Sequence, residues 1–492
     1  MTASTPTRTS NTHPLRIDTV LPAPGMGRIG LTFCPGKTQL SAMSGHWNRC
    51  LETDLDTIRD WNAAAVVTLI EDHEFDALQV RDLGEEVQRR HMAWYHLPIP
   101  DVSVPGADFE AAWMQAGSEL RARLRQGADI IVHCKGGLGR AGTIAARLLV
   151  ELGVADPEAA IQRVRAVRPG AIETCKQESH VRAIRPAPPA IPSTSAEAIC
   201  DRAAGALLGL AIGDAIGTTL EFTRRDSRAR LIDIVGGGPF GLKPGEWTDD
   251  TAMALALADS LAECGRLDEA DLMRRFTAWH DDGVYSCTGT CFDIGITTRA
   301  ALSRFQLSGN PVAGDANPST AGNGSLMRLA PVAIRFWNDP AKLVDAAARQ
   351  SRTTHAAPEA VDACVAFARM LADAIAGRSL AEILGDPGIQ LPGVIGEIVA
   401  GSWRTKPRAM IASSGYVAHS LEAALWSVGR SAGYRESVLT AANLGDDADT
   451  TAAIAGQLAG AAWGASGIPV QWRERVAWSN RIAQMAERLL AV

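Results

Sequence analysis

Residues 133–143 read His-Cys-Lys-Gly-Gly-Leu-Gly-Arg-Ala-Gly-Thr and directly follow the apolar run Ile130-Ile131-Val132. The apolar run predicts a buried strand, and the glycine-rich stretch predicts a tight loop before a helix that begins near Arg140. Glycines let backbone N–H groups turn inward onto an anion, and a helix N-terminus adds its positive dipole. We therefore expect a strand, loop and helix with a phosphate-binding loop formed by Lys135, Gly136, Gly137, Leu138, Gly139 and Arg140.

Cys134 stands at the end of this strand, where inward N–H groups favour the thiolate, the nucleophilic form of cysteine. Arg140 offers a planar, bidentate grip on a phosphoryl group. Asp101, on a proline-rich loop after another strand-like run, is the expected general acid and then general base. We expect Thr143 to hydrogen-bond to the sulfur and Gln177 to orient the hydrolytic water. These residues predict phosphoester hydrolysis through a cysteinyl-phosphate, with no cofactor in this part of the chain.

Plainer alternatives exist for each of these assignments. A Cys-x5-Arg pattern also arises by chance, Asp101 can be a simple turn former, and Gln177 can lie on a helix surface. The preceding strand, the glycines, the following helix and the upstream Asp101 together favour the catalytic interpretation.

The composition divides the chain into four segments. Residues 1–24 are rich in Thr, Pro and Ser and are expected to be a disordered tail. Residues 25–184 alternate strand-like runs with helical ones, which predicts an α/β fold with a mostly parallel sheet flanked by helices. The expected strands are 64–70, 93–99 and 129–134, and the expected helices are 108–126, 142–153 and 157–168. Residues 185–196 are proline-rich and predict a stiff linker.

Residues 197–492 are expected to form a second domain that is all-α. Long Ala/Leu-rich segments dominate it, and convincing strands are absent. The expected helices lie near 199–212, 250–264, 268–280, 340–349, 357–376, 418–429, 450–463 and 472–490. Small residues at Gly205, Gly209, Gly213, Gly456 and Gly460 would let helices approach closely.

Two acidic clusters in this second domain each precede an apolar helix. They read Glu246-Trp-Thr-Asp-Asp250 and Asn443-Leu-Gly-Asp-Asp-Ala-Asp-Thr450. Helix capping is the plainer interpretation, because Thr and Asp are preferred N-caps and acids suit the first turn. Together, however, the clusters offer only hard oxygen ligands, which favours Mg²⁺ or Mn²⁺ over zinc. Because so many carboxylates repel one another unless cations neutralise them, we expect two ions.

The first domain resembles the dual-specificity branch of the cysteine-dependent protein phosphatases over about residues 25–180. The stretches Gly30–Lys37, Thr68–Glu71 and Cys134–Arg140 resemble the cyclin-dependent kinase inhibitor 3 group in particular. The resemblance implies the nucleophile, phosphate-binding and acid roles for Cys134, Arg140 and Asp101. Ala141 stands where the family mostly has Ser, which leaves any hydroxyl role to Thr143.

The second domain resembles the ADP-ribosylglycohydrolase family, of the dinitrogenase-reductase-activating glycohydrolase type, over about residues 198–490. The resemblance is carried by the two acidic clusters and by Ala206–Gly217, Glu221-Phe222, Ser286–Gly295, Gly322–Arg328, Thr354-His355 and Leu421–Trp426. It implies the metal ligands Thr248, Asp249, Asp250, Asp447, Asp449 and Thr450, with Asp449 bridging. It also implies that Glu221 lies near the scissile bond, and that the ADP-ribose pocket is lined by Asn323, Gly324, Ser325, Met327 and His355.

These residues also have structural alternatives. Glu221 can be a surface acid after a helix, His355 a helix cap, and Arg328 a structural ion-pair partner. Cys287 and Cys291 form Cys-x3-Cys without further zinc ligands, and we interpret them as buried small residues.

The overall composition excludes several functional classes. With 46% apolar and 21% charged residues and a net charge of −7, the chain is typical of soluble globular proteins. It has no basic block for nucleic acid or an anionic membrane, and no apolar run of about 18 residues for a membrane span. A signal-peptide pattern is missing from the N-terminal segment. The nine scattered cysteines argue against a disulfide framework and favour the cytoplasm.

Three functional hypotheses follow. The first is a bifunctional hydrolase that dephosphorylates a phosphoprotein or other phosphoester and removes ADP-ribose from a protein side chain, with arginine as the favoured acceptor. The second is a sequential enzyme on one small molecule, such as a phosphorylated ADP-ribose or nucleotide. In the third, one domain is a non-catalytic reader of phosphate or ADP-ribose. The sequence leaves the target protein and the oligomeric state open.

Overall fold

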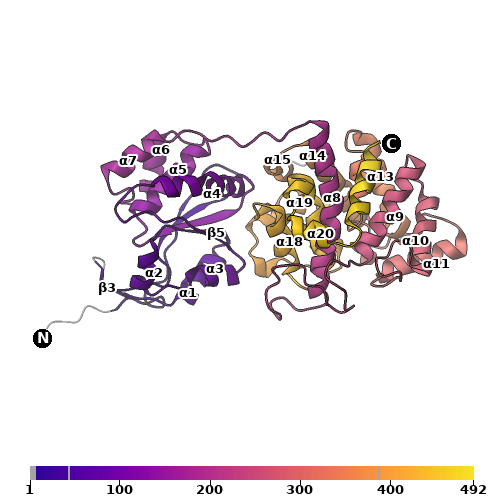
Figure 1. The fold of residues 1–492 in the computed structure, drawn as a ribbon, viewed down its shortest axis with the longest axis horizontal. Helices are drawn as coiled ribbons and strands as arrows, with labels where there is room; N and C mark the ends of the chain where they lie inside the picture. The colour runs from indigo at the N-terminus through magenta and orange to yellow at the C-terminus, as the bar shows by residue number, and fades with distance from the viewer. Residues whose placement is uncertain (1–6, 43–44, 386–387, 492) are drawn as a thin grey trace. The chain divides into compact units, whose positions relative to one another are not determined.

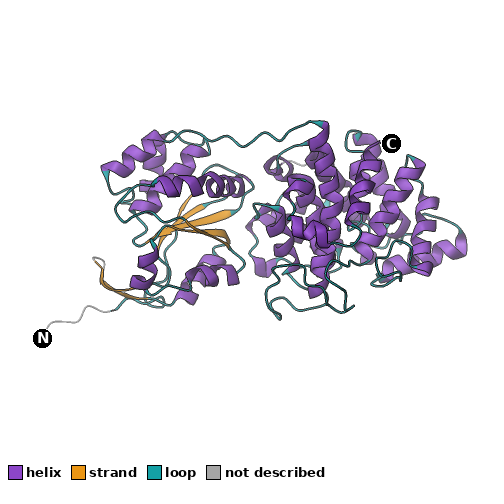
Figure 2. Cartoon of the chain, viewed as in Figure 1, coloured by secondary structure: helices purple, strands orange, loops and turns teal. Residues whose placement is uncertain are grey.

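The computed structural model describes residues 7–42, 45–385 and 388–491, and the chain divides between Ala190 and Ile191 into two compact units. The first unit is an α/β layer and the second is helical, as expected (Figures 1 and 2). The division falls inside the proline-rich segment 185–196.

The first unit is built on a five-stranded sheet in the order β1-β2-β7-β5-β6. β2, β7, β5 and β6 are parallel, and the edge strand β1 pairs antiparallel with β2. The strands of this sheet are β1 (Asp18–Val20), β2 (Ile29–Phe33), β5 (Ala63–Thr68), β6 (Ala93–His96) and β7 (Asp129–Cys134). A separate hairpin pairs β3 (Thr38–Ala42) with β4 (Gly45–Asn48).

Helices cover both faces of the sheet, so its inner strands are buried on both sides (Figure 1). Alternate residues of β7 illustrate this, since Ile130 and Val132 enter one core and Ile131 enters the other. One face carries α4 (Ala107–Arg125), α5 (Gly139–Glu151), α6 (Pro157–Val167) and α7 (Cys175–Ala183). The other carries α1 (Leu51–Asp60), α2 (Asp72–Leu78) and α3 (Leu83–Arg89).

The expected disordered tail is wrong for the described part of residues 1–24. Residues 18–20 form β1, and Leu15 and Val20 are buried in the two cores. The Asp18 carboxylate forms ion pairs with Arg16 at 2.6 Å and with Arg168 at 2.6 Å. The Thr- and Pro-rich composition concealed these few anchoring residues, which hold the segment against the sheet.

The described residues of the second unit form helices joined by loops, with isolated bridges in place of strands. Its helices are α8 (Ala196–Gly217), α9 (Asp249–Cys264), α10 (Glu269–Asp282), α11 (Ile296–Ser308), α12 (Ala330–Arg335), α13 (Pro340–Thr354), α14 (Pro358–Ala376), α15 (Leu380–Gly385), α16 (Gly393–Val399), α17 (Val417–Gly429), α18 (Tyr434–Ala442), α19 (Ala448–Trp463), α20 (Val470–Arg475) and α21 (Ser479–Ala491). The segment expected as one helix over 472–490 is two helices, because Trp478 takes φ +59° between them and packs its ring 5.2 Å from that of Trp247.

α8 and α19 are antiparallel and touch backbone to backbone. A Cβ added at Gly209 would lie 2.3 Å from the carbonyl oxygen of Gly456, and one added at Gly213 would lie 2.2 Å from that of Ala452. The same contact joins Gly205 to Gly460. α8 is long and apolar enough to cross a membrane, but 89% of its apolar stretch is buried inside the protein. Packing against its neighbours therefore accounts for its apolar composition.

Candidate active sites

The predicted phosphate-binding loop lies at the carboxyl end of β7, the central strand of the sheet. Cys134 is 3% exposed, and its Sγ accepts a hydrogen bond from the backbone N–H of Gly137 at 3.2 Å. Gly137 has φ +71°, and a Cβ there would lie 2.4 Å from the carbonyl oxygen of Thr32. Glycine at this position therefore lets the backbone N–H point at the sulfur.

Arg140 lies in the first turn of α5, where a carboxylate of α2 holds it. Its Nη1 donates to Oε2 of Glu74 at 2.6 Å and its Nη2 to Oε1 at 3.1 Å. The same Nη2 lies 3.0 Å from Oδ1 of Asp101, so the structure brings two predicted site residues together. Burial alone would lower the pKa of Arg140, but Glu74 and Cys134 raise it above its usual value. The guanidinium therefore keeps its charge for an anion.

Two basic residues that sequence reasoning missed hold the loop from outside. Arg168 donates from Nε to the carbonyl of Gly137 at 3.0 Å and from Nη2 to that of Gly136 at 3.1 Å. Lys37 is buried, and its Nζ donates to the carbonyl of Lys135 at 3.1 Å. Burial lowers the pKa of Lys37 to about 8. Because these side chains bind loop carbonyls, the loop amides stay directed toward the centre.

The contact expected between Thr143 and the sulfur is not formed. The Thr143 hydroxyl donates its hydrogen to the carbonyl of Gly139 at 2.7 Å, one turn earlier in α5. Gln177 is fully buried, and its Oε1 accepts the N–H groups of Glu173 and Thr174 as part of a capping box. Its role in orienting water stays a prediction.

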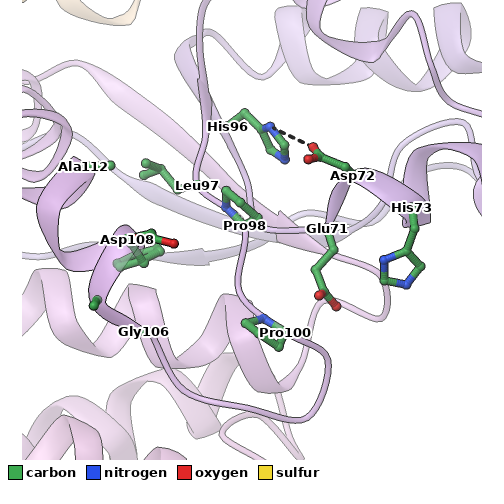
Figure 3. A pocket seen from close by; sticks show the side chains of 12 residues that line it. Glu71, Asp72, His73, His96, Leu97, Pro98, Pro100, Gly106, Asp108 and Ala112 are labelled. Carbon is green, nitrogen blue, oxygen red and sulfur yellow. Dashed lines mark ion pairs between the residues drawn. The ribbon is translucent and has the colours of Figure 1, made fainter.

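A cavity of about 550 Å³ adjoins the loop that carries Asp101 (Figure 3). Its lining includes the first turns of α2 and α4 and the segment after β6. Glu71, in this wall, accepts the backbone N–H of Asp101 at 3.1 Å. His96 faces Asp72, with Nδ1 3.8 Å from Oδ1. The cavity wall therefore positions the backbone of the acid loop.

The two acidic clusters of the helical unit meet at the ends of three helices. Asp214, Asp250 and Asp449 can place one carboxylate oxygen each within 4.8 Å of one another. A second group, Glu221, Asp447 and Asp449, does the same, so Asp449 belongs to both. α8, α9 and α19 supply most of these residues, so helix packing positions the cluster.

Asp214, to which the sequence analysis gave no role, organises the start of α9. Its Oδ1 accepts the N–H and hydroxyl of Thr248 at 2.9 Å, and its Oδ2 accepts those of Thr251 at 3.0 and 2.6 Å. The hydroxyl of Thr450 donates to Oδ1 of Asp250 at 3.2 Å and so links the two clusters. The same acidic residues therefore cap the helix starts and gather into one carboxylate cluster, so the two interpretations do not exclude each other.

Among the described residues, the buried carboxylates have too few positively charged neighbours to neutralise them. Burial and then neighbouring carboxylates raise the pKa of Asp249 and Asp250 well above their usual values and that of Asp447 to about 7. Oδ2 of Asp250 is buried and has no hydrogen-bond partner among the residues described. An all-oxygen donor set with an unsatisfied buried oxygen fits hard divalent cations.

Three residues with left-handed backbone line the cavity beside this cluster. They are Phe222 at φ +56°, Asp293 at φ +60° and Asp446 at φ +60°. Burial and then Asp249 raise the pKa of Asp293 to about 11, so it belongs electrostatically to the cluster. Glu221 accepts the N–H groups of Ala448 at 3.1 Å and Asp449 at 3.4 Å. It therefore caps α19 and is not a surface acid.

The opposite wall of this cavity of about 470 Å³ is neutral and polar. Gly322, Asn323, Gly324, Met327 and His355 line it. Asn323 donates from Nδ2 to Oδ2 of Asp447 at 2.7 Å, which ties the wall to the acidic cluster.

The prediction that Ser325 lines the ADP-ribose pocket is wrong, because Ser325 does not line this cavity. It is fully buried, with its Oγ 2.8 Å from that of Ser351. The chain turns between Asn323 and Met327, so Ser325 points into the core.

A buried hydrogen-bond chain fixes the orientation of His355. Arg328 donates from Nη2 to Oγ1 of Thr354 at 2.8 Å, and this hydroxyl lies 2.8 Å from Nδ1 of His355. Because the guanidinium can only donate, the Thr354 oxygen accepts from it, and the hydroxyl hydrogen is available to donate to Nδ1. Burial and then Arg328 lower the pKa of His355 to about 3, so the ring is neutral. When the Thr354 hydroxyl donates to Nδ1, the ring hydrogen is on Nε2. The structural ion-pair alternative for Arg328 is not supported, since it binds Gln350 and Thr354 rather than a carboxylate.

Comparison with known proteins gives a separate match for each unit. The family model for ADP-ribosylglycohydrolase matches residues 195–492. The model described as Swiss Army Knife protein, DSP-PTPase phosphatase domain, matches residues 37–181.

Individual relatives divide in the same way. The ADP-ribosylarginine hydrolase Tri1 of Pseudomonas putida (strain GB-1) is 46% identical over 323 residues, which are 64% of this chain and 87% of that protein. Cyclin-dependent kinase inhibitor 3 of Rattus norvegicus is 31% identical over 139 residues, which are 28% of this chain and 64% of that protein. A solved structure, the ADP-ribosylglycohydrolase-related protein complex, has a TM-score of 0.52 and 37% identity, covering 60% of this chain and 98% of that chain.

Proposed function

We propose that this protein, which belongs to the ADP-ribosylglycohydrolase family and carries a dual-specificity phosphatase domain ahead of it, removes ADP-ribose from arginine side chains with one domain and hydrolyses phosphoesters with the other. The carrying observation is that each domain assembles its own set of reactive groups. These are Cys134, Arg140 and Asp101 in the first, and the buried carboxylates beside a neutral polar wall in the second.

In the phosphatase domain, the Cys134 thiolate attacks phosphorus and forms an S–P bond as the ester P–O bond breaks. Arg140 and the loop amides bind the phosphoryl oxygens and stabilise the negative charge spread over them in the transition state. Asp101 gives its proton to the leaving oxygen. The carboxylate of Asp101 then takes a proton from water, which breaks the S–P bond and restores the thiolate. The net products are an alcohol and inorganic phosphate.

In the second domain, the neutral wall suits the uncharged hydroxyls and rings of ADP-ribose. Asn323 is fixed by Asp447, and the Nε2–H of His355 is a donor for a ligand oxygen. Water attacks the anomeric carbon as the bond to the guanidine nitrogen breaks. We propose that Glu221 takes a proton from the attacking water. Glu221 then passes this proton to the guanidine nitrogen as that nitrogen leaves. The surrounding carboxylates stabilise the oxocarbenium character of the transition state.

Two Mg²⁺ or Mn²⁺ ions are the proposed cofactors of this domain. Their ligands would come from Thr248, Asp249, Asp250, Asp447, Asp449 and Thr450. Asp214 approaches the same cluster but already accepts four hydrogen bonds, so we assign it to positioning Thr248 and the start of α9. When bound, such ions would neutralise the carboxylates and polarise a water and the ribose hydroxyls. The phosphatase domain needs no metal.

Release of ADP-ribose from an arginine-ADP-ribosylated protein tests the proposal. We expect release with Mg²⁺ or Mn²⁺ and none with excess EDTA. Phosphatase activity on a phosphopeptide should persist in EDTA and disappear in Cys134→Ser, which should still release ADP-ribose. Absence of release with either metal would contradict the glycohydrolase assignment.

A further inference from the structure

Phe222 combines two features that are unusual for a large apolar residue. Its side chain is 68% exposed, although it follows the buried Glu221 directly. Its φ of +56° lies in the left-handed region, which is an outlier for an aromatic residue. Such strain persists only where the surrounding structure enforces it, and it concentrates at functional sites.

Backbone hydrogen bonds to the second acidic cluster hold Phe222 in this conformation. The N–H of Phe222 donates to the carbonyl of Asp446 at 2.8 Å, and the N–H of Asp446 donates to that of Thr223 at 2.8 Å. Asp446 is itself left-handed. The two segments therefore fix each other, and the exposed ring is held at the cavity beside Glu221.

Two further rings extend this surface. The Phe240 ring lies 6.4 Å from that of Phe222 at 72°, and the Phe292 ring lies 5.3 Å from that of Phe240 at 54°. We call Phe222, Phe240 and Phe292 the aromatic wall. Asp293 follows Phe292 directly, so carboxylates adjoin the wall on two of its segments.

An exposed aromatic face is a site that suits a cation. A guanidinium lies well on an aromatic ring, where the quadrupole of the ring attracts its charge. The uncharged hydroxyls and rings of ADP-ribose suit the neutral wall of Asn323 and His355 better. The two sides of the cavity therefore differ in the chemical groups that they suit.

We propose that the aromatic wall, chiefly Phe222, binds the guanidinium of the acceptor arginine and so determines acceptor specificity. This inference rests on the proposed glycohydrolase function and names the acceptor side of its site. An adenine ring on Phe222 is the competing occupant, and it makes a different prediction for free ADP-ribose.

The test measures kcat/KM for an arginine-ADP-ribosylated peptide, together with inhibition by ADP-ribose and by agmatine, a free guanidinium compound. For Phe222→Leu we expect kcat/KM to fall by roughly 3- to 30-fold, the range of a cation–π contact. The agmatine inhibition constant should rise similarly, and that of ADP-ribose should not change. Phe222→Tyr should restore most of the loss. Met410→Ala is the control, because Met410 is exposed and adjoins Phe222 in a neighbouring cavity.

Two results would overturn the inference. An equal weakening of ADP-ribose in Phe222→Leu would place the nucleotide on the ring, and unchanged kinetics would remove any role for it. If the wild-type protein releases no ADP-ribose from arginine, the proposed function fails instead. Melting temperatures of all variants should match, because the ring is exposed.

Discussion

Glu74 and Arg140 form a buried ion pair in which each carboxylate oxygen faces a different guanidinium nitrogen, at 2.6 and 3.1 Å. Burial alone would raise the pKa of Glu74, but Arg140 lowers it below its ordinary value, so both groups are charged. The pair fixes the plane of the guanidinium before a phosphate arrives.

For Glu74→Gln we expect the KM for a phosphopeptide to rise by about tenfold and the free energy of unfolding to fall by about 1–3 kcal/mol, since a buried charge loses part of its partner. Phosphatase kinetics and urea unfolding measure the two effects. Glu85→Gln, at an exposed acid on α3 that pairs with Arg89, should change neither. Unchanged KM in Glu74→Gln would show that the loop orients Arg140 without this partner.

Arg168 joins the loop carbonyls to Asp18, so the N-terminal segment should affect phosphatase activity. For Arg168→Gln we expect kcat/KM on a phosphopeptide to fall by about tenfold, because loop carbonyls are released, while release of ADP-ribose stays the same. Arg182→Gln is the matched control, because Arg182 is an exposed arginine of the same domain that pairs with the exposed Glu158. Equal losses of activity in both variants would contradict a specific role for Arg168 in holding the loop carbonyls.

His133 makes the phosphatase domain sensitive to acid. Burial lowers its pKa from 6.5 to about 3, so the folded state requires the neutral ring. The unfolded state binds more protons between these values, so stability is full above pH 6.5 and is lost as the pH falls toward 3. In His133→Asn, the stability difference from wild type should change by about 2 kcal/mol between pH 7 and 5, in favour of the variant. Urea unfolding measures it, and the exposed His73→Asn should show no such change.

Thr354 carries the hydrogen bond that orients His355. In Thr354→Val the hydroxyl is lost, so we expect KM for the ADP-ribosylated substrate to rise by about fivefold and stability to fall by about 1–2 kcal/mol. Thr354→Ser should behave as wild type. Nitrogen-15 NMR of the histidine rings should show hydrogen on Nε2 of His355 in the wild type and a mixed tautomer in Thr354→Val. A ring with hydrogen on Nδ1 in the wild type would refute the chain.

The sequence predicted the chemistry that depends on local spacing. Strand β7 and the loop after it follow from an apolar run and glycines, so the roles of Cys134 and Arg140 could be predicted from the sequence alone. The two acidic clusters were accessible for the same reason, since each precedes its own apolar helix. Within them, the sequence could not reveal that Asp214 unites the start of α9 through four hydrogen bonds.

Residues that act across distant segments were not predictable. Glu74 and Arg168 reach the phosphate loop from other elements, and no local pattern announces either. Ser325 illustrates the opposite failure, because a short motif says which residues are near a site but not which way each side chain points. Thr143 failed for a related reason, since a helical hydroxyl can bond to the carbonyl one turn earlier.

The glycine contact between α8 and α19 has a consequence for which cations the helical domain accepts. Asp214, near the end of α8, holds the proposed ligand Thr248, and Asp449 lies in the first turn of α19. Where the two backbones touch, the helices cannot move closer together, so the distance between these two ligand positions is fixed. A set of oxygen ligands at fixed distances selects ions by ionic radius. Mg²⁺, which is small and binds six ligands at short distances, is therefore favoured over the larger Ca²⁺. We therefore expect the selectivity of this domain among divalent ions to be set by the spacing of two helix axes.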